Sequence, residues 1–446
     1  MGAIVSAEDF VLQDGSRIAV IGGGPAGSFF SIFALKMARM LGKELEITIY
    51  EPKDFTKDGP GGCNRCGGVI SELLVQTLAL EGINLPDSVV QRGINAYQLY
   101  TNYGTASIAT PAHEKTIATV YRGGGPKGTI GSDKDSFDKF LLDMAVEEGA
   151  LHEKIKVDRV EYKNGKPVLY SKDGELINAD LLVGAFGINS TTPKIIEDLG
   201  IGYKRPDTAV TAMAELKYDS TVIAKHFGNA IHLFLLPIRD IKFAAIIPKG
   251  TYITVCILGK TIDANIVNDF LENRVVKNAL PQDVDYELMC RCLPKMNIRA
   301  PASGYADRVV MCGDAGSTRL FKDGLGAAYI MGKAAAKAAV LHGVSSTHFR
   351  EHYLPVYKNI ITDNLYGSCL YVVSDMYRNY PLLTKGMLAI VNDEQKKVDN
   401  PKKLSTVLWG MFTGNERYRN MFNVAMTVPL QAAFWREHAK ILVGRG

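Results

Sequence analysis

The sequence predicts an α/β fold in which a nucleotide-binding domain is interrupted by a mostly antiparallel β region and followed by a helical C-terminal region. Three observations predict this fold. A strand, a glycine-rich turn and a helix follow one another near the N-terminus, and a similar series returns after residue 307. Segments that alternate apolar and polar residues lie between them. Apolar stripes at helical spacing fill the chain after residue 346.

The first of these signals runs from Arg17 to Glu51. Residues 17–21 are typical of a strand, residues 28–41 of a helix, and the turn spells GxGxxG with Gly22, Gly24 and Gly27. In a Rossmann-type domain the first glycine allows the turn, the second lets the backbone approach a pyrophosphate, and the third lets the helix pack on the strand. Phosphate binds at the helix N-terminus. A second strand ends at Glu51, where a carboxylate can accept hydrogen bonds from an adenosine ribose. A dinucleotide site is favoured over a plain glycine-rich turn.

Composition limits the class of protein. The 446 residues are 47% hydrophobic and 22% charged, which predicts a large core, two or three subdomains and a soluble chain. The net charge of +4 comes without a basic run or an RNA-type aromatic motif, so we expect no nucleic-acid partner. Neither a signal peptide nor an apolar run of about eighteen residues is found. The seven cysteines are then expected to be reduced thiols in a cytoplasmic location.

A cysteine-containing loop follows Glu51. In GGCNRCGGVISELL, residues 61–74, four glycines bracket Cys63 and Cys66, and Ser71 can cap the next helix. Such a loop brings backbone close to a flat group. Residues 91–121 alternate like strands, which suits a sheet laid across a cofactor.

A second GxGxxG is formed by Gly123, Gly125 and Gly128. No helical pattern follows it, because residues 129–135 are mostly Gly, Ser, Asp and Lys. We interpret it as a loop, and the alternative is a separate nicotinamide site. Downstream, residues 136–150 predict a helix, residues 155–162 and 166–171 predict strands joined by a hairpin turn at 163–165, and residues 180–190 predict a buried strand.

The nucleotide fold returns at residues 308–340, after a mostly antiparallel region at 191–295. An apolar strand delivers Gly313 and Asp314 to a turn, and Gly324 and Gly326 open a helix with a small-residue face. An acid here can hold a ribitol or pyrophosphate edge, and helix N–H groups can point at an electron-rich ring. We therefore predict a nucleotide-binding domain from 1–90, 122–190 and 301–345, a substrate domain from 91–121 and 191–300, and a helical region at 346–446.

The chain resembles, in the order and spacing of its motifs, the FAD enzymes of the para-hydroxybenzoate hydroxylase superfold. The motifs that carry this resemblance are GGGPAG with Glu51, SFDKFLLDMAVEEGA, DLLVGAFGINS and MCGDAG with DGLG. Within that superfold, CNRCGGVIS and IIPKG are most similar to the geranylgeranyl reductase family. The resemblance covers roughly residues 17–340, and the tail matches only loosely.

The resemblance implies a resident FAD in a Rossmann-type FAD-binding domain. It places Glu51 at the adenosine ribose, Asp314 at the ribitol, residues 324–326 beside the flavin ring and Cys66 near its reactive face. The residues that it implies for cofactor binding are Gly22, Gly24, Pro25, Ala26, Gly27, Glu51, Arg65, Gly187, Gly313, Asp314, Gly324, Leu325 and Gly326. The candidate catalytic residues are Cys66 and Gly67.

The sequence departs from the family pattern at three places. Lys134 stands where the family has an Arg before the Phe-Asp pair, and Phe186-Gly187 stands for the Asp-Gly of the second ribose motif. The aromatic strand YxWxFP reads here as Phe243, Ala245, Ile247 and Pro248. FAD binding is expected to survive these changes, whereas the lost rings would have shaped the substrate pocket.

Cysteine spacing leaves three interpretations. Cys63, Cys66, Cys290 and Cys292 could hold zinc or an iron–sulfur cluster, or one pair could exchange electrons with flavin. The favoured interpretation has Cys66 as a lone pocket residue and the others as packing residues, with no metal. Cys256, Cys312 and Cys369 are expected to be small buried hydrophobes.

The tail carries two apolar and aromatic stripes, around residues 366–373 and 404–435, separated by a charged segment at 392–403 that we expect to be a solvated loop. Packing in a core is the favoured interpretation. The alternative is a cover over a lipid channel or a helix resting on a bilayer, with Trp409, Phe412, Met421, Phe422 and Phe434 in contact and Arg436, Lys440 and Arg445 as the basic flank. Peripheral membrane contact is therefore kept as an expectation.

Three functions are compatible with these features. The first is a flavin reductase that saturates a carbon–carbon double bond of an isoprenoid or other apolar lipid. The second is a flavin monooxygenase acting on an aromatic ring; a halogenase is disfavoured because the WxWxIP motif is absent. The third is a flavin electron-transfer protein. With one complete dinucleotide motif, reducing electrons are expected from transiently bound NAD(P)H or from a ferredoxin-type carrier protein.

Overall fold

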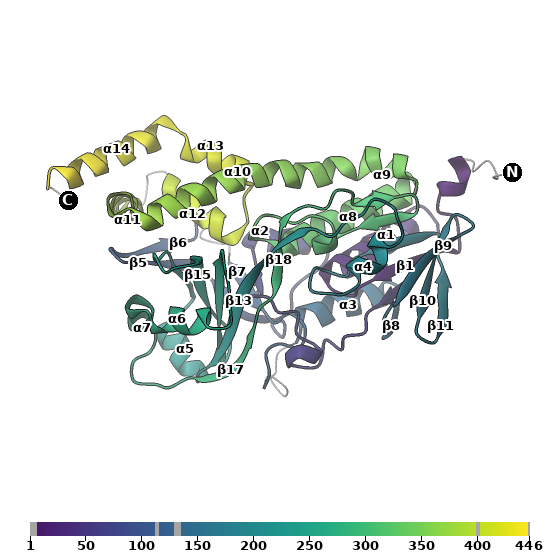
Figure 1. Cartoon of the computed structure of the whole chain (residues 1–446), viewed down its shortest axis with the longest axis horizontal. Coiled ribbons are helices and arrows are strands. Elements are labelled where there is room, and N and C mark those ends of the chain that lie inside the picture. Colours follow the sequence, from purple (N-terminus) through teal and green to yellow (C-terminus); the bar gives the residue numbers. More distant parts are fainter. Residues whose placement is uncertain (1–6, 112–115, 129–134, 398–401, 445–446) are drawn as a thin grey trace. The chain divides into compact units, whose positions relative to one another are not determined.

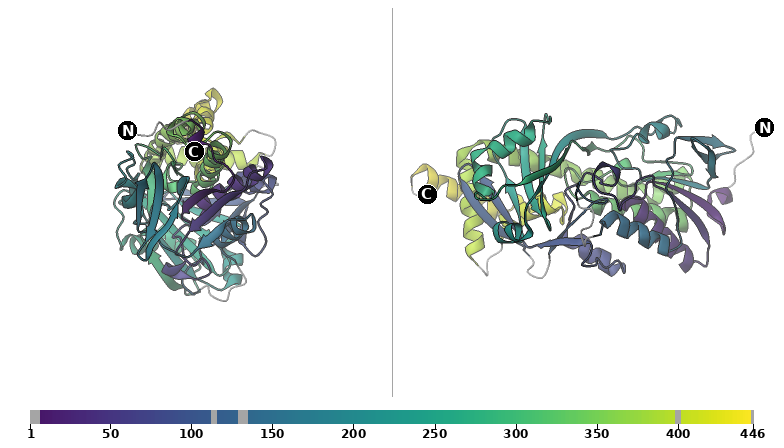
Figure 2. Two further views of the ribbon diagram at one scale, coloured as in Figure 1. Left: turned by 90° about the vertical axis from the view of Figure 1, so that its right-hand side faces the viewer. Right: turned by 90° about the horizontal axis from the view of Figure 1, so that it is seen from below.

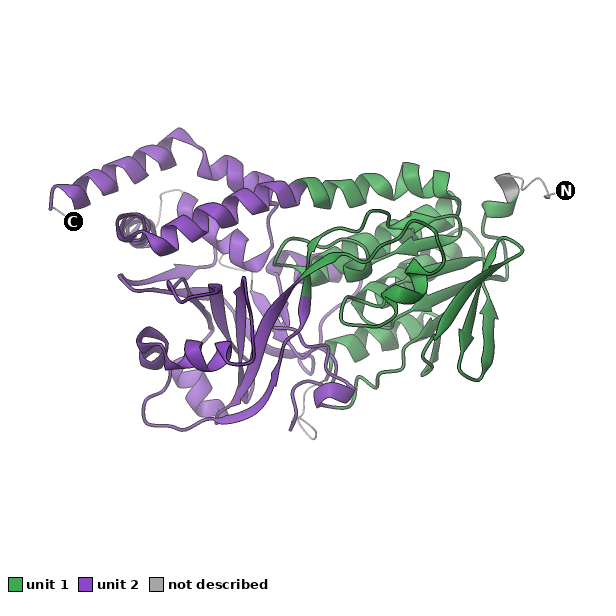
Figure 3. Cartoon of the chain, in the orientation of Figure 1, with its two compact units in different colours: residues 1–57, 136–208, 296–362 green, residues 58–135, 209–295, 363–446 purple. Residues whose placement is uncertain are grey.

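The computed structural model describes residues 7–111, 116–128, 135–397 and 402–444. It divides into two compact units, each assembled from separate stretches of chain (Figure 3). Unit 1 contains residues 1–57, 136–208 and 296–362, and unit 2 contains residues 58–135, 209–295 and 363–446. Figure 1 and the two further views in Figure 2 show the chain coloured by sequence, from the N-terminus in purple to the C-terminus in yellow. None of the helices within the described ranges has the length and apolar character that a membrane span requires.

Unit 1 is built on a six-stranded sheet with the strand order β19-β20-β12-β1-β2-β8. The strands are parallel except β19, which pairs antiparallel at one edge. The predicted strand at 180–190 is shorter in the structure and ends at Gly184. The bounds are β1 Ser16–Ile21, β2 Leu45–Tyr50, β8 Leu151–Glu153, β12 Leu181–Gly184, β19 Tyr305–Ala306 and β20 Val309–Met311.

Helices of unit 1 pack on one another through small residues. Helix α1 packs against α8 and α3. At Gly332 of α8 an added Cβ would lie 3.0 Å from the carbonyl oxygen of Ala26 in α1, which explains the small-residue face predicted there. The bounds are α1 Pro25–Met40, α3 Phe137–Glu147, α4 Pro193–Glu197, α8 Gly324–Leu341, α9 Ser346–His352 and the start of α10 Leu354–Asn379, with 3-10 turns η1 Ala7–Phe10 and η3 Gly313–Ala315.

A small antiparallel sheet completes unit 1, with β9 Arg159–Lys163, β10 Lys166–Ser171 and β11 Gly174–Asn178. The hairpin turn predicted at 163–165 is confirmed, because Asn164 and Gly165 both have positive φ, 51° and 75°. The strand predicted at 155–162 begins only at Arg159. Buried side chains join this sheet to the large one, among them Val160, Leu169, Leu182 and Met311.

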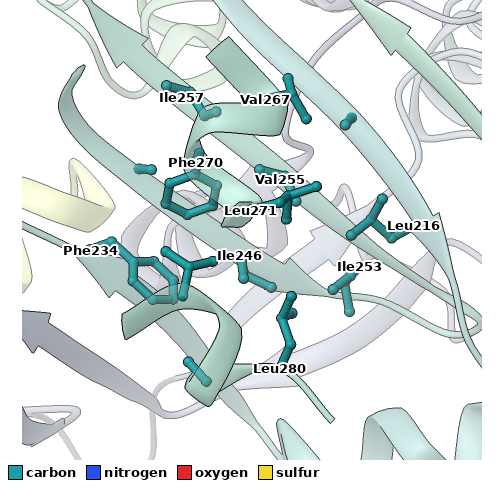
Figure 4. Close-up of a cluster of buried hydrophobic side chains, with 14 of the residues drawn as sticks. Leu216, Phe234, Ile246, Ile253, Val255, Ile257, Val267, Phe270, Leu271 and Leu280 are labelled. Atoms are coloured by element: carbon teal, nitrogen blue, oxygen red, sulfur yellow. The ribbon is translucent and has the colours of Figure 1, made fainter. Parts of the chain in front are cut away.

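Unit 2 contains the antiparallel region that the alternating segments predict. Its main sheet has the order β17-β13-β16-β15-β14-β5-β6, and only β14 and β5 pair in parallel. Apolar side chains on one face of this sheet pack with α6 and α7 in the core drawn in Figure 4, where Phe234, Ile246, Val255 and Phe270 lie together. The bounds are β5 Ala96–Thr101, β6 Gly104–Ala109, β13 Asp207–Lys217, β14 Ala230–Phe234, β15 Ile241–Pro248, β16 Tyr252–Gly259 and β17 Glu287–Cys292, with α5 Ser220–His226, α6 Ile266–Glu272 and α7 Arg274–Ala279. The strand β18 Lys295–Arg299, most of which belongs to unit 1, pairs with β13.

The cysteine loop of unit 2 leads into a second, smaller sheet with the order β3-β7-β4. Ser71 caps α2 as predicted, because its hydroxyl accepts a hydrogen bond from the backbone N–H of Leu74. The bounds are η2 Gly59–Gly61, β3 Val69–Ile70, α2 Glu72–Leu80, β4 Val90–Ile94 and β7 Ile117–Val120.

The C-terminal region of unit 2 is helical, as predicted. It contains the end of α10 together with α11 Pro381–Lys396, α12 Lys403–Thr413, α13 Tyr418–Ala425 and α14 Val428–Leu442. The solvated loop predicted at 392–403 is wrong over its first half, because α11 continues to Lys396, and residues 398–401 lie outside the described ranges.

Several predicted lipid contacts in the tail are also wrong. Trp409, Phe412 and Met421 are buried at 0, 4 and 2% exposure, because α12 packs on the main sheet, where the ring of Trp409 lies 4.9 Å from that of Tyr97. Phe422 and Phe434 are half-buried. The part of the stripe in α12 is therefore core, which confirms the favoured interpretation there, whereas Val372, Val428 and Trp435 are exposed.

Candidate functional site

The first glycine turn, at the carboxyl end of β1, gives its three glycines different surroundings. At Gly22, with φ of 108°, an added Cβ would lie 2.5 Å from the carbonyl oxygen of Ala185. At Gly27 it would lie 2.0 Å from the carbonyl oxygen of Gly22. At Gly24 the nearest protein atom would be Oδ1 of Asp138, at 3.8 Å. The protein itself therefore requires glycine at the first and third positions, whereas the space beside Gly24 is open to a ligand.

The start of α1 is also open. Gly24 is its N-cap residue and offers no side-chain hydrogen bond, and Pro25 and Ala26 begin the helix. By contrast, Ser71 caps α2 and Ser136 caps α3 with their hydroxyls. The uncapped N–H groups of α1, with the positive end of the helix dipole, fit the pyrophosphate of a dinucleotide.

Glu51 stands at the end of β2, beside this turn. Its Oε2 accepts a hydrogen bond of 3.0 Å from the backbone N–H of Gly23, and Oε1 accepts one of 2.9 Å from that of Lys53. Burial raises the pKa of this carboxyl group, and the two backbone hydrogen bonds oppose the shift. The structure thus holds the carboxyl group of Glu51 next to the first glycine turn.

The second turn follows β20 in the same unit. Gly313 has φ of 60°, and an added Cβ would lie 2.7 Å from Cβ of Ala26, so the turn packs directly on the start of α1. The side-chain amide of Asn297 donates a 2.8 Å hydrogen bond to the carbonyl oxygen of Asp314. Oγ of Ser317 and Oδ1 of Asn297 are buried and have no hydrogen-bond partner among the described residues. The turns predicted from Gly22 and from Gly313 are therefore brought together.

The start of α8 contains a residue that sequence reasoning missed. Asp323 adopts a left-handed conformation, φ 54°, and its carboxylate accepts a 3.0 Å hydrogen bond from the N–H of Gly326. An added Cβ at Gly326 would lie 2.4 Å from that carboxylate, whereas Gly324 has no neighbour closer than 3.8 Å. Asp-x-x-Gly at a helix start was the available signal. The N–H of Gly326, one of the residues predicted to lie beside a flavin ring, is thus occupied by the carboxylate of Asp323.

The remaining candidate of unit 1 is Gly187, which follows β12. It has φ of 66° and no atom within 4 Å of an added Cβ. Phe186, which replaces the usual acid, places its ring 6.5 Å from that of Tyr203 and so packs inside the unit. Lys134, the other departure in this domain, lies outside the described residues.

The cysteine loop in unit 2 is tightly constrained. Arg65 has φ of 52°, and its backbone N–H donates a 3.2 Å hydrogen bond to Sγ of Cys63. At Gly67 an added Cβ would lie 3.1 Å from Cδ1 of Ile247, and at Gly68 it would lie 2.0 Å from the carbonyl oxygen of Val120. The loop is thus held on the small sheet and on β15. Cys66 and Gly67, the candidate catalytic residues, are half-buried within it.

The second GxGxxG has a structural explanation inside unit 2. At Gly123, with φ of 61°, an added Cβ would lie 1.8 Å from the carbonyl oxygen of Gly62, and the N–H of Gly59 donates to the carbonyl oxygen of Gly125 at 3.0 Å. These glycines let one loop pass close to the cysteine loop. The predicted loop is confirmed over residues 123–128, and residues 129–134 lie outside the described ranges.

A buried charged pair lies close to the cysteine loop. Lys249, only 1% exposed, places Nζ 4.0 Å from Oε1 of Glu215 and 5.4 Å from the ring centroid of Tyr121. An added Cβ at Gly68 would lie 3.5 Å from Nζ. Glu215 accepts a 2.8 Å hydrogen bond from the hydroxyl of Thr254, and burial raises the pKa of its carboxyl group. Sequence reasoning missed this pair because Lys249, which directly follows β15, and Glu215 in β13 are far apart in the sequence.

The thiols near this loop are partly buried. Burial raises the pKa of Cys63, of Cys290 and of Cys292, the last to about 12. Without a bound partner, these groups are therefore thiols at neutral pH. No group of three or more His, Cys, Asp or Glu in the described part of the chain is arranged to hold a metal ion. Cys312 is buried as predicted, but Cys256 is only half-buried and Cys369 in α10 is exposed, contrary to prediction.

Comparison with known proteins identifies the fold. Neither a scan against models of protein families nor a search of curated proteins finds a match. Among solved structures, a geranylgeranyl bacteriochlorophyll reductase-like protein from Thermoplasma acidophilum is 16% identical, with a TM-score of 0.63 over 93% of this chain and 99% of that chain. A flavoprotein/dehydrogenase from Cytophaga hutchinsonii is 15% identical, with a TM-score of 0.64 over 96% and 100%. The p-nitrophenol 4-monooxygenase from Pseudomonas putida is 12% identical, with a TM-score of 0.59 over 91% and 100%.

The TM-scores of 0.63, 0.64 and 0.59 show a common fold, although the sequence identities are low. The chain has the α/β architecture, the antiparallel insertion and the helical C-terminal region predicted from its sequence, and shares them with a reductase-like protein, a flavoprotein and a monooxygenase. The fold expected from the predicted resemblance is thereby confirmed, and the chain shares it with a geranylgeranyl bacteriochlorophyll reductase-like protein.

Proposed function

We propose that this protein is an FAD-dependent oxidoreductase that reduces a carbon–carbon double bond of an isoprenoid or other apolar lipid. The observation that carries the proposal is the first turn of unit 1, with open space beside Gly24, an uncapped α1 and a fixed carboxylate at Glu51. These features fit a dinucleotide, and the similar flavoprotein favours FAD over NAD as that dinucleotide.

The residues of this chain would have separate roles. The N–H groups of Ala26 and Gly27 would bind the pyrophosphate, Glu51 the adenosine ribose, and Asp314 the ribitol. Bound FAD would supply a hydride. The cysteine loop supplies a thiol at Cys66 that would orient the substrate or relay a proton, and its glycines hold that thiol in one place. The flavin would be reduced by transiently bound NAD(P)H or by a ferredoxin-type carrier.

A monooxygenase acting on an aromatic ring is the second candidate, favoured by the structural similarity to p-nitrophenol 4-monooxygenase. The reductase is preferred because the cysteine loop and the IIPKG segment resemble the reductase family. Both candidates require bound FAD, and they differ in what oxidises the reduced protein.

Two experiments on the purified protein separate the candidates. Mass spectrometry of co-purified small molecules should identify an unsaturated lipid if the reductase proposal is correct. Stopped-flow mixing of the reduced protein with that lipid under anaerobic conditions should then oxidise the flavin and yield the saturated product. Oxidation that occurs only with oxygen and transfers an oxygen atom to an aromatic compound would replace the reductase with the monooxygenase.

A further inference from the structure

The last helix, α14, exposes a continuous apolar face. Val428, Ala432, Trp435, Ala439 and Leu442 are all exposed, and their alternating spacing of four and three residues places them in one stripe along the helix. The large side chains of this stripe, Val428, Trp435 and Leu442, are 80, 74 and 73% exposed. An exposed Trp in such a stripe is unusual for a surface that faces only water.

The opposite face of α14 holds the helix on unit 2. Leu430 is buried, the ring of Phe434 lies 5.6 Å from that of Tyr377 in α10, and the ring of His438 fills the space beside Gly386 of α11. The helix is therefore packed in a defined orientation, and its apolar stripe points away from the protein. No described segment covers the stripe.

Positive charge lies along one side of the stripe. Arg436 and Lys440 follow Trp435 and Ala439 by one residue, and their side chains are 61 and 50% exposed. Both contact Glu437, whose own side chain is only 15% exposed. Asp393 of α11, whose side chain is 51% exposed, also lies near this side of the stripe, and its hydrogen bond with Lys397 together with the charges of Arg436 and Lys440 lowers the pKa of its carboxyl group. With Lys397 included, the cations here still outnumber the carboxylates of Asp393 and Glu437. The predicted third member of the basic flank, Arg445, lies outside the described residues.

We propose that α14 docks the protein on an anionic lipid bilayer. Its apolar stripe would enter the interfacial layer, Trp435 would lie at headgroup depth, and Arg436 and Lys440 would reach the phosphates. A second copy of the chain fits the stripe less well, because it would bring two flanks of net positive charge together, whereas an anionic bilayer complements that charge. The bilayer would thus contact Trp435 in place of Trp409 and Phe412, which are buried. This docking does not depend on which reaction the protein catalyses.

Co-sedimentation of the full-length protein with vesicles tests the proposal. Vesicles of phosphatidylcholine with phosphatidylglycerol should bind the wild type more tightly than vesicles of phosphatidylcholine alone, and added salt should weaken binding. Trp435→Ser combined with Leu442→Ser should weaken binding about ten-fold or more, since two large apolar side chains no longer enter the interface. The matched control combines Leu80→Ser with Leu151→Ser, which removes two leucines that are 88 and 62% exposed elsewhere, and should bind like the wild type.

Tryptophan fluorescence gives a second readout. The sequence has two tryptophans, of which Trp409 is fully buried and donates a 2.7 Å hydrogen bond to Glu72. A blue shift on adding anionic vesicles should therefore arise from Trp435 and vanish in Trp435→Ser. Equal vesicle binding by the double variant and the wild type would overturn the proposal. A wild type that binds no vesicles and forms a dimer in analytical ultracentrifugation would also overturn the proposal, if Trp435→Ser makes that dimer monomeric. Flavin content is measured in the same samples, so a failure to bind FAD is recorded separately from a failure to dock.

Discussion

Substitution of the glycines in the first turn separates ligand binding from folding. Gly24→Val should give a folded protein that binds no FAD, because φ of −68° and ψ of −176° suit a β-branched residue and the nearest protein atom lies 3.8 Å from the new Cβ. The side chain would instead occupy the space proposed for the pyrophosphate. Gly27→Ala should impair folding itself, because its Cβ would lie 2.0 Å from a backbone carbonyl oxygen.

The magnitudes differ enough to measure. For Gly24→Val we expect a change in the free energy of unfolding of the flavin-free protein within about 1 kcal/mol, since loss of a favourable N-cap residue is partly offset by reduced entropy of the unfolded chain. For Gly27→Ala we expect a loss of roughly 2–3 kcal/mol or more, because backbone must move. Removing two charge-assisted N–H contacts to phosphate should weaken FAD binding by about 3 kcal/mol or more, beyond a hundred-fold.

The assay is denaturant unfolding of flavin-free protein together with titration of each variant with FAD. Gly24→Val that retains wild-type affinity would refute the assignment of the pyrophosphate site. Gly27→Ala that is as stable as the wild type would refute the close packing on which the comparison rests. Either result would show that the turn is wrongly interpreted.

Three further predictions concern titratable groups. Cys66→Ser should keep FAD and thermal stability but lower the rate at which substrate reoxidises the reduced protein; an unchanged single-turnover rate would leave Cys66 as a plain pocket residue. Burial raises the pKa of Glu51 above its ordinary value of 4.5, so FAD affinity should fall as pH drops through the raised pKa. The flavin-free protein should lose stability as pH rises from 4.5 through the raised pKa, because the buried carboxyl group then becomes charged. A Glu51→Gln variant should show neither dependence. Lys249→Met should destabilise the protein by roughly 3–5 kcal/mol by leaving Glu215 buried without its partner, and the loss should grow as pH rises through the raised pKa of Glu215, whereas a flat pH profile would contradict the buried pair.

Local sequence patterns predicted the parts of the fold whose causes are local. The turn at Gly22, the cap at Ser71 and the hairpin at 163–165 each depend on residues within a few positions of one another, and each is found. The resemblance to the para-hydroxybenzoate hydroxylase superfold then predicted how the strands and helices are ordered into a nucleotide-binding domain with an inserted antiparallel region. The second GxGxxG was likewise predicted to be a loop, because no helical pattern follows it. The close approach of Gly62, which explains why Gly123 is a glycine, could not be predicted.

Contacts between distant segments explain what the sequence did not predict. Trp409 is buried because it packs on Tyr97 and donates to Glu72, which is 337 residues away in the chain. The Lys249–Glu215 pair likewise joins residues that are far apart in the sequence. An amphipathic pattern also does not tell which face of a helix is covered, so Trp435 on the outer side of α14 was overlooked in favour of the buried Trp409. Such assignments need the tertiary structure.

The most direct test of the central claim is the flavin content of the protein. We predict that the purified chain, or the chain reconstituted with added FAD, shows a flavin absorption spectrum, and that mass spectrometry of the released cofactor identifies FAD at one molecule per chain. Folded protein that stays colourless after incubation with excess FAD would contradict the proposed function.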